Sequence, residues 1–254
     1  MEADEMIEVT IEPVVEVKAK GRVIVSAKVG VSADIVPDIL DLYLPLESFH
    51  DGVSLQVRRQ GKVADVTYGK GSFWTRNKQV DWTKLLVAVD DPPKHHEHHT
   101  EGLTLYASDL QTGIDCRHLP YPDGFLDMLF FDPPFAGTGG DGRTGKKISG
   151  NPTVSGYGNL SLGSRSTKVI IKLYEEGLAE AHRVLKKGGY AVAKVCDQVE
   201  SGKNQWLHTI IMATPGYVCE DLFILVSRGQ PMMRHSYQKH GRKNCSYFIV
   251  LRRV

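Results

Sequence analysis

The sequence predicts an α/β fold, built as a doubly wound and mostly parallel sheet with helices on both faces. Its 254 residues, 41% of them hydrophobic and 24% charged, are typical of one soluble domain with modest extensions. Short apolar runs recur along the chain, each followed by a polar or Gly/Pro-rich turn, as is usual for buried parallel strands. An amphipathic helix separates two of these runs, and alternation of strand and helix favours an open parallel sheet.

The predicted strands follow an irregular N-terminal stretch. Six apolar runs have the length and composition of buried strands: residues 63–66, 103–106, 127–131, 190–195, 222–226 and 246–251. Before them, alternating apolar residues around 9–15 and 23–25 predict short strands or an extended arm, and Pro37 suits the first turn of a short helix. We therefore expect an N-terminal arm over residues 1–60 and one domain over residues 61–254.

The clearest predicted helix precedes the run at residues 190–195. Apolar residues recur there at spacings of three and four and form one stripe: Ile171, Tyr174, Leu178, Ala181 and Leu185. Two lysines and two glycines, residues 186–189, end the helix, because cations and a glycine cap suit a helix C-terminus. We expect the apolar stripe to pack on the sheet.

Composition argues against several classes of protein. No apolar run reaches the roughly 18 residues that a membrane span needs. The acidic first residues differ from the basic start of a secretory signal, so we expect a cytoplasmic protein without membrane contacts. Four cysteines form no CxxC pair, which favours reduced thiols over a structural zinc site: Cys116, Cys196, Cys219 and Cys245. The four histidines within residues 95–99 are interpreted as a hydrophilic surface loop rather than a metal site.

A long glycine-rich segment interrupts the predicted order over residues 136–168. It holds nine glycines, and five basic residues against one acidic residue. A loop of this length is unusual in a compact domain and is either functional or disordered. Its basic residues are Arg143, Lys146, Lys147, Arg165 and Lys168.

The sharpest motif is Asp132-Pro133-Pro134-Phe135, directly after the apolar run that ends at residue 131. In an open α/β sheet, ligands bind beyond the carboxyl ends of the strands, so this motif lies over the expected site. The Asp132 carboxylate and the Pro133 carbonyl can accept both N–H bonds of an exocyclic amino group, which directs the nitrogen lone pair at an incoming methyl group. The prolines fix the backbone in advance, and Phe135 offers a flat face to an extruded base. The alternative is a tight turn whose phenylalanine folds into the core.

The loop after the first strand of the domain suits a second ligand. This loop, DVTYGKG, contains Asp65, Thr67, Gly69 and Gly71. Its glycines allow the backbone to approach a ligand closely, although an ordinary tight turn has the same composition.

Acidic residues after the second strand suit a nucleoside. Asp109 follows that strand and can accept both hydroxyls of a ribose, with Asp90 or Asp91 as a rival. Six residues later, the Asp115 carboxylate can accept the amino group of an adenine while the Cys116 N–H donates to the ring. One loop would then hold one nucleoside.

Together, these motifs resemble the class I S-adenosylmethionine-dependent methyltransferases, in particular the amino-methyltransferases of the DNA adenine-N6/cytosine-N4 group. The matching segments, which cover roughly residues 60–254, are DVTYGKG, SDLQTGIDCRHLPYPDG, LFFDPPF, EAHRVLKKGGYAVAKVCD, EDLFILV and RKNCSYFIVLRR. The resemblance implies a seven-stranded Rossmann-like sheet with an antiparallel C-terminal strand and S-adenosylmethionine in the crevice. The DPP form resembles adenine-type enzymes, whereas Phe135 stands where members of the group usually have tyrosine or tryptophan.

The resemblance also implies roles for single residues. The loop from Asp65 to Gly71 would bind the methionine end of the cofactor, Asp109 its ribose and Asp115 its adenine. A large target-recognition region, usual in sequence-specific DNA methylases, is replaced by short segments, so we expect loose sequence specificity. The candidate nucleic-acid contacts are Arg143, Lys146, Lys147, Tyr157, Arg165, Lys168, Lys243 and Asn244.

We therefore expect a monomeric or homodimeric enzyme that methylates adenine N6 in DNA. RNA, at adenine N6 or guanine N2, is the alternative substrate. An inactive nucleic-acid-binding subunit with the same fold is the alternative from another class of protein.

Overall fold

The computed structural model describes most of the predicted strands and helices. The described residues are 24–44, 46–50, 55–59, 61–68, 71, 73–74, 87–88, 96–100, 103–108, 113–133, 167–200, 202–227, 240–241 and 243–254. Within these ranges, no helix is both long and apolar enough to cross a membrane.

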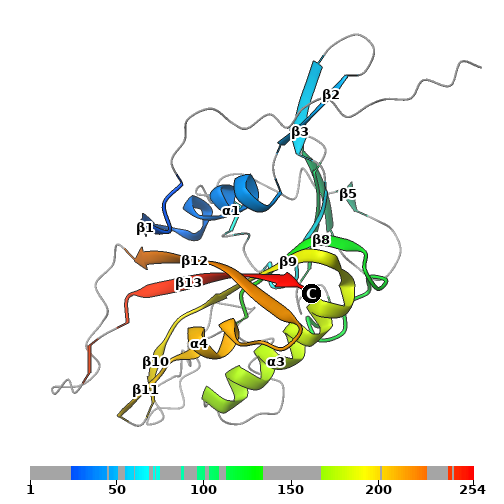
Figure 1. The fold of residues 1–254 in the computed structure, drawn as a ribbon. Coiled ribbons are helices and arrows are strands. Elements are labelled where there is room, and N and C mark those ends of the chain that lie inside the picture. Colours follow the sequence, from blue (N-terminus) through cyan, green and yellow to red (C-terminus); the bar gives the residue numbers. More distant parts are fainter. Residues whose placement is uncertain are drawn as a thin grey trace, which may run out of the picture.

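A nine-stranded sheet forms the centre of the molecule (Figure 1). Its middle has four parallel strands, in the order β9 (Leu185–Val195), β8 (Leu126–Phe131), β4 (Gly61–Asp65) and β7 (Leu103–Ala107). Strand β13 (Cys245–Arg253) lies between β9 and β12 (Tyr217–Ser227) and runs antiparallel to both. The predicted α/β fold with an antiparallel C-terminal strand is confirmed.

The strand order reverses at β4. From this strand the chain passes to β7 on one side, and later to β8 and β9 on the other. Such a reversal opens a crevice at the carboxyl ends of the two adjacent strands, where ligands bind in this class of sheet. Asp65 ends β4 and Asp132 follows β8, so both residues lie at this position.

Outer strands make the sheet larger than the seven strands expected. Strand β1 (Ala27–Gly30) pairs in parallel with β12, and β6 (His96–Thr100) pairs antiparallel with both β7 and β5 (Val87–Ala88). The interpretation of the histidine segment as a surface loop is wrong, because β6 is paired with β7 over its whole length. The N-terminal strand lies at residues 27–30 rather than 23–25, and the strands predicted around residues 9–15 lie outside the described residues.

Helices cover both faces of the sheet, as predicted. Helices α3 (Thr167–Val184) and α4 (Leu207–Met212) pack on one face, and α1 (Val36–Tyr43) packs on the other after the short helix η1 (Ser32–Asp34). Successive β8 residues alternate between the two cores: Leu129 and Phe131 pack with α3, whereas Met128 and Phe130 pack with α1. A strand that is buried on both faces is a continuous apolar run in sequence, and this explains why β8 was predicted correctly.

Helix α3 confirms the centre of the predicted apolar stripe, whereas Ile171 is only partly buried and Leu185 already belongs to β9. Tyr174, Leu178 and Ala181 are fully buried on the sheet side. The helix ends at Val184, and Gly188 then adopts a φ of +79°, a backbone conformation that residues with a side chain rarely adopt. Gly188 lies inside β9, four residues after the end of α3, in the stretch between Leu185 and Tyr190 where the pairing with β8 shifts register, so the predicted glycine cap at the helix end is not confirmed.

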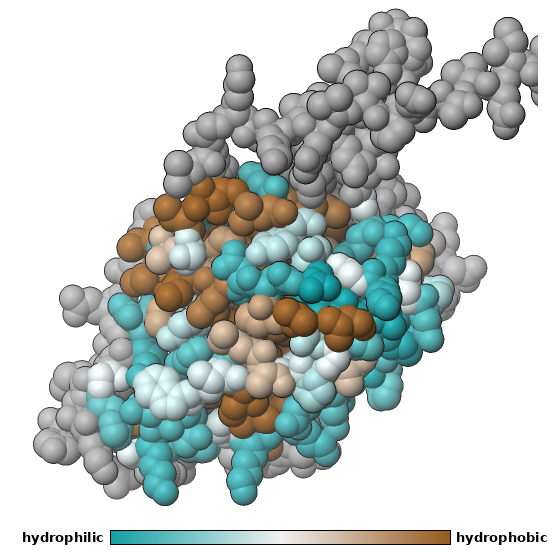
Figure 2. Space-filling view, in the orientation of Figure 1, coloured by the Kyte–Doolittle hydropathy of each residue, from teal (hydrophilic) through white to brown (hydrophobic). Residues whose placement is uncertain are grey.

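Part of the expected N-terminal arm packs on the domain. Strand β1 extends the sheet, and α1 begins with Pro37 in its first turn, as predicted. Figure 2 shows apolar side chains gathered over β1 and α1, where Val29 is 61% and Leu42 47% exposed. Two hairpins stand apart from the main sheet, β2 (Leu46–His50) with β3 (Leu55–Arg59), and β10 (Gln198–Glu200) with β11 (Lys203–Gln205).

Candidate active site

The predicted site residues divide into those that the structure describes and those outside its described ranges. The described ones are Asp65, Thr67, Gly71, Asp115, Cys116, Asp132, Pro133, Lys168, Lys243 and Asn244. The others are Gly69, Asp109, Pro134, Phe135, Arg143, Lys146, Lys147, Tyr157 and Arg165. The roles of both groups remain predictions, and only the first group can be placed in the fold.

The backbone at Asp132 is fixed by the neighbouring strand. Its N–H donates to Thr67 Oγ1 at 2.6 Å, and the Val66 N–H donates to the Phe130 carbonyl at 3.2 Å. Thr67 is buried, so this hydrogen bond is protected from water. The loop after β4 and the motif after β8, expected to serve two different ligands, are therefore held as one unit.

The Asp132 side chain has one engaged oxygen and one open oxygen. Lys194 Nζ donates to Asp132 Oδ2 at 2.8 Å. Asp132 Oδ1 is also buried, but accepts no hydrogen bond from any of the described residues. Burial raises the pKa of the Asp132 carboxyl, and the charge and hydrogen bond of Lys194 oppose that rise. The sequence interpretation missed Lys194, although a lysine within the apolar run YAVAKV is itself an unusual feature.

The first candidate cofactor residue, Asp65, shapes the loop that follows it. Its Oδ1 accepts the Thr67 N–H at 3.2 Å and its Oδ2 accepts the indole N–H of Trp74 at 2.9 Å. Gly71 in this loop has a φ of +68°, and a Cβ there would lie 2.7 Å from the Tyr68 hydroxyl oxygen. Only glycine fits that position without a shift of the tyrosine.

The end of β7 contributes a further polar group. The Ser108 N–H donates to the Asp65 carbonyl at 2.9 Å, and the Ser108 carbonyl accepts from the Tyr68 N–H at 3.1 Å. Ser108 is fully buried, yet its Oγ has no hydrogen-bond partner among the described residues. A buried hydroxyl of this kind beside the crevice is a donor and acceptor available to a ligand.

The second candidate cofactor strip is held by an arginine that the sequence interpretation did not consider. Arg117 donates to both oxygens of Asp115, at 2.6 Å from Nη2 to Oδ2 and 3.0 Å from Nε to Oδ1, and also to Glu176 at 3.3 Å. Burial would raise the pKa of the Asp115 carboxyl, but the hydrogen bonds and charge of Arg117 outweigh burial and lower it. Cys116 is fully buried in the core beneath α3. The predicted contact of Asp115 with an adenine amino group would therefore compete with Arg117.

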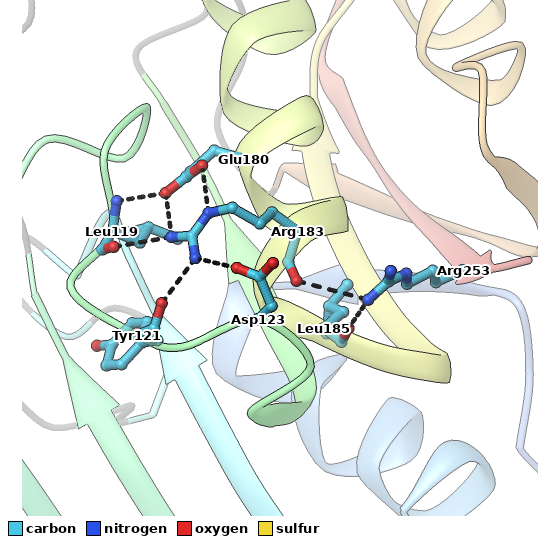
Figure 3. A network of polar contacts seen from close by, with 7 residues as sticks. All are labelled: Leu119, Tyr121, Asp123, Glu180, Arg183, Leu185 and Arg253. Atoms are coloured by element: carbon cyan, nitrogen blue, oxygen red, sulfur yellow. Dashed lines mark hydrogen bonds and ion pairs between the residues drawn. The ribbon is translucent and has the colours of Figure 1, made fainter.

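A second arginine clamps the loop that follows Asp115 onto α3 (Figure 3). Arg183 donates to the Leu119 carbonyl at 3.0 Å and to the Tyr121 carbonyl at 2.9 Å. It also pairs with Asp123 at 2.7 Å and with Glu180 at 2.6 Å, and Glu180 accepts the Leu119 N–H at 2.7 Å. This network fixes the path of the chain between the candidate cofactor strip and β8.

Replacing Arg183 by methionine is expected to lower the free energy of unfolding by about 2 kcal/mol, because several hydrogen bonds at partly buried sites are lost together. The matched control is Arg252→Met. The Arg183 and Arg252 side chains are 36% and 37% exposed, but Arg252 is engaged in a single ion pair with Glu220 among the described residues. An exposed pair of this kind contributes about 0–1 kcal/mol. Urea denaturation of both variants checks the prediction, and equal losses would contradict the clamp.

The described residues that are candidates for nucleic-acid binding lie at the same edge of the sheet as Asp132. Lys243 Nζ lies 4.3 Å from the centroid of the Trp206 ring, which is 47% exposed. Asn244 and Lys168 are exposed, Asn244 just before β13 and Lys168 in the first turn of α3. The contacts of these residues with nucleic acid remain predictions. The sequence interpretation did not include Trp206, an exposed aromatic residue that lies beside Lys243.

Comparison with known proteins adds only distant similarities. The sequence matches no protein-family model and no curated protein. Among solved structures, the chain is similar to TrmN from Thermus thermophilus, with 14% identity over 87% of this chain and 49% of that chain and a TM-score of 0.42. Another Thermus thermophilus protein, described as a DNA modification methylase and solved with S-adenosyl-L-methionine, has 17% identity over 55% of this chain and 53% of that chain, with a TM-score of 0.35.

A third similar structure is an S-adenosylmethionine-dependent methyltransferase from Methanosarcina mazei, with 10% identity over 77% of this chain and 93% of that chain and a TM-score of 0.37. The chain spans about half the length of the two Thermus proteins. At these identities and TM-scores, no activity or substrate transfers from one protein to the other. The function must therefore be argued from the residues at the sheet edge.

Proposed function

We propose that the chain transfers a methyl group from S-adenosyl-L-methionine to the exocyclic amino group of a nucleobase, with adenine N6 in DNA as the first candidate. The observation that carries this proposal is Asp132 Oδ1, a buried acceptor with no partner among the described residues, at the crevice between β8 and β4. A buried acceptor without a partner costs roughly 1–3 kcal/mol, and it is retained where a ligand supplies the donor. An amino group supplies such a donor.

The residues beside the crevice also fit the proposed cofactor. The Ser108 hydroxyl is buried and has no hydrogen-bond partner among the described residues, and the backbone at Gly71 carries no Cβ, which would meet the Tyr68 hydroxyl oxygen at 2.7 Å. Asp65 fixes the shape of the loop after β4, because its carboxylate accepts hydrogen bonds from Thr67 and Trp74. We assign Gly71 and Ser108 to direct contacts with the cofactor, and Asp65 to the shape of its loop. When bound, the cofactor supplies a methyl group on a sulfonium, which passes to the amino nitrogen as the carbon–sulfur bond breaks and sulfur keeps the electron pair.

The chain itself contributes position and proton transfer. Asp132 Oδ1 accepts one N–H of the amino group, and the Pro133 carbonyl is the predicted acceptor of the other. These bonds direct the nitrogen lone pair away from the ring, which is catalysis by orientation. Because the methylated nitrogen carries an extra proton, Asp132 Oδ1 is also the nearest group that can accept it. No covalent bond between the enzyme and the base is needed.

The first test is binding of the cofactor. Addition of S-adenosyl-L-methionine is expected to raise the melting temperature, because a ligand present at 100 times its Kd stabilises the native state by about 2.7 kcal/mol. Incubation with DNA or RNA, followed by mass spectrometry of the digested nucleosides, then identifies the product. N6-methyl-2′-deoxyadenosine from the DNA arm supports the proposal, and a methylated nucleoside from RNA alone would redirect it to RNA. No melting shift and no methylated nucleoside in either arm would indicate an inactive subunit.

A further inference from the structure

Lys194 is placed beside Asp132 by the register of two parallel strands. Phe131 at the end of β8 pairs with Ala193 of β9, so the next residues along the two strands, Asp132 and Lys194, are also adjacent. Their side chains are 19% and 12% exposed, and the distance from Nζ to Oδ2 is 2.8 Å. The strand pairing that forms the core therefore brings a cation to one oxygen of the candidate catalytic carboxylate.

The surroundings of Lys194 restrict where its ammonium group can lie. Its Nζ is 5.4 Å from the centroid of the Phe73 ring and 5.8 Å from that of Phe248. Both rings belong to the core on the α1 face and are buried. A cation at this distance from aromatic faces is stabilised by them, and the rings also exclude water. On the backbone side, the Tyr174 hydroxyl of α3 donates to the Lys194 carbonyl.

We propose that Lys194 is a positioning residue for methyl transfer: it binds Asp132 Oδ2, favours the ionised form of the carboxylate, and leaves Oδ1 as the acceptor for the target base. The inference rests on the proposed function and specifies its substrate class. An ionised carboxylate accepts hydrogen bonds but donates none. The site thus selects a base edge that presents an N–H donor, as adenine, cytosine and guanine amino groups do. It disfavours a carbonyl edge, as in thymine or uracil.

The pH dependence follows from the titratable groups that interact with Asp132. Among the described residues these are Lys194 from β9 and the phenol of Tyr174 from α3, whose own pKa is raised first by burial and then by Asp132. Burial holds the Asp132 pKa above its ordinary value even with Lys194 present, so removal of the lysine raises the pKa further. Only the ionised carboxyl is active, so the rate increases as pH rises through this pKa. Loss of Lys194 is thus expected to move the acidic limb of the rate profile to higher pH.

The test compares three variants of the full chain: Lys194→Met, which removes the charge at similar length, Lys194→Arg, which keeps it, and Lys187→Met as a control. Lys187 is exposed near the opposite end of β9. At neutral pH, kcat of Lys194→Met is expected to fall on the order of 10-fold to 100-fold, with partial recovery as pH rises. Lys194→Arg is expected to retain most of the activity, and Lys187→Met all of it. The melting shift with S-adenosyl-L-methionine should be unchanged in every folded variant.

A carboxyl carbon NMR titration of Asp132, assigned with Asp132→Asn, provides a readout that needs no activity. The Asp132 pKa is expected to be higher in Lys194→Met than in the unmodified protein. If the unmodified protein methylates a base while Lys194→Met keeps its rate and pH profile, the positioning role is wrong. If the titration shows the same Asp132 pKa in both proteins, the ion pair does not control the charge, whether or not methylation is observed. Absence of methylation by the unmodified protein would instead reject the proposed function, and the titration still decides the inference about the pair.

Discussion

Substituting Asp132 by alanine is expected to abolish methyl transfer, with kcat lower by on the order of 10³-fold or more, because the acceptor that orients the amino group is lost. Binding of S-adenosyl-L-methionine should survive, since the residues assigned to it lie on β4, β7 and their loops. Alanine also removes a carboxylate partner of the Lys194 ammonium at a site that is mostly buried, which lowers stability. Measurements of kcat and of the melting shift with cofactor separate these two effects.

The isosteric variant Asp132→Asn provides the stricter comparison. Its single carbonyl oxygen can accept from Lys194, and the amide NH2 then takes the place of Oδ1 and faces the amino group donor to donor. We expect Asp132→Asn to lose nearly as much turnover as Asp132→Ala, but to lose less stability. The control is Asp127→Asn at the start of the same strand, where the carboxylate binds Lys186 and the Lys62 N–H. Methylation retained in Asp132→Asn would refute the role of the carboxylate.

The parts of the fold that were predictable from sequence are those buried on both faces. Residues such as Met128 to Phe131 are apolar without interruption because one side packs on α1 and the other on α3. Strand β6 was not predicted, because its sequence, HEHHT, is polar and its strand conformation comes from pairing with β7 and with the edge strand β5. Polar strands in the outer part of a sheet carry little of the hydrophobic signal on which such predictions depend.

The candidate site was predicted only as far as local motifs allow. Asp65 and Asp132 were placed correctly at strand ends, because the carboxyl ends of parallel strands meet at one edge. Their partners were not predictable. Thr67 binds a residue 65 positions away and Lys194 one 62 positions away, and both contacts depend on strand register. Arg117 and Arg183, which bind the loop around Asp115, were not predictable either, because in the sequence they look like ordinary surface residues.

Alanine at Gly177 is expected to destabilise the protein, although the same change in an exposed helix position is stabilising. In the interior of a helix, alanine is favoured over glycine by about 1 kcal/mol. A Cβ on Gly177, however, would lie 2.4 Å from Phe131 Cζ. The Phe131 ring is fully buried and meets the edge of Tyr174 at 5.3 Å, so it cannot move aside freely. Overpacking of this kind costs about 1–3 kcal/mol, and we expect a net loss of about 1 kcal/mol.

The sign of this effect is measurable against a reciprocal change in the same helix. Ala179 is exposed on α3, so Ala179→Gly reports the helix propensity alone and should cost about 1 kcal/mol. If Gly177→Ala instead raised the free energy of unfolding by that amount, the contact with Phe131 would not be tight. The double variant Gly177→Ala with Phe131→Leu is expected to lose less free energy of unfolding than the two single variants lose together, because the shorter side chain relieves the overlap.

Because Phe131 is directly followed by Asp132, the same overlap should reach the site. A ring pushed from α3 shifts the end of β8, and with it the carboxylate whose neighbouring N–H is bound by Thr67. Near-attack geometry tolerates little displacement, so kcat of Gly177→Ala should fall more than its small loss of stability explains. Arg183→Met, which is destabilised more but at the other end of β8, supplies the comparison. Greater loss of turnover in the more stable of these two variants would show that the position of Asp132 depends on the close approach of α3 to β8.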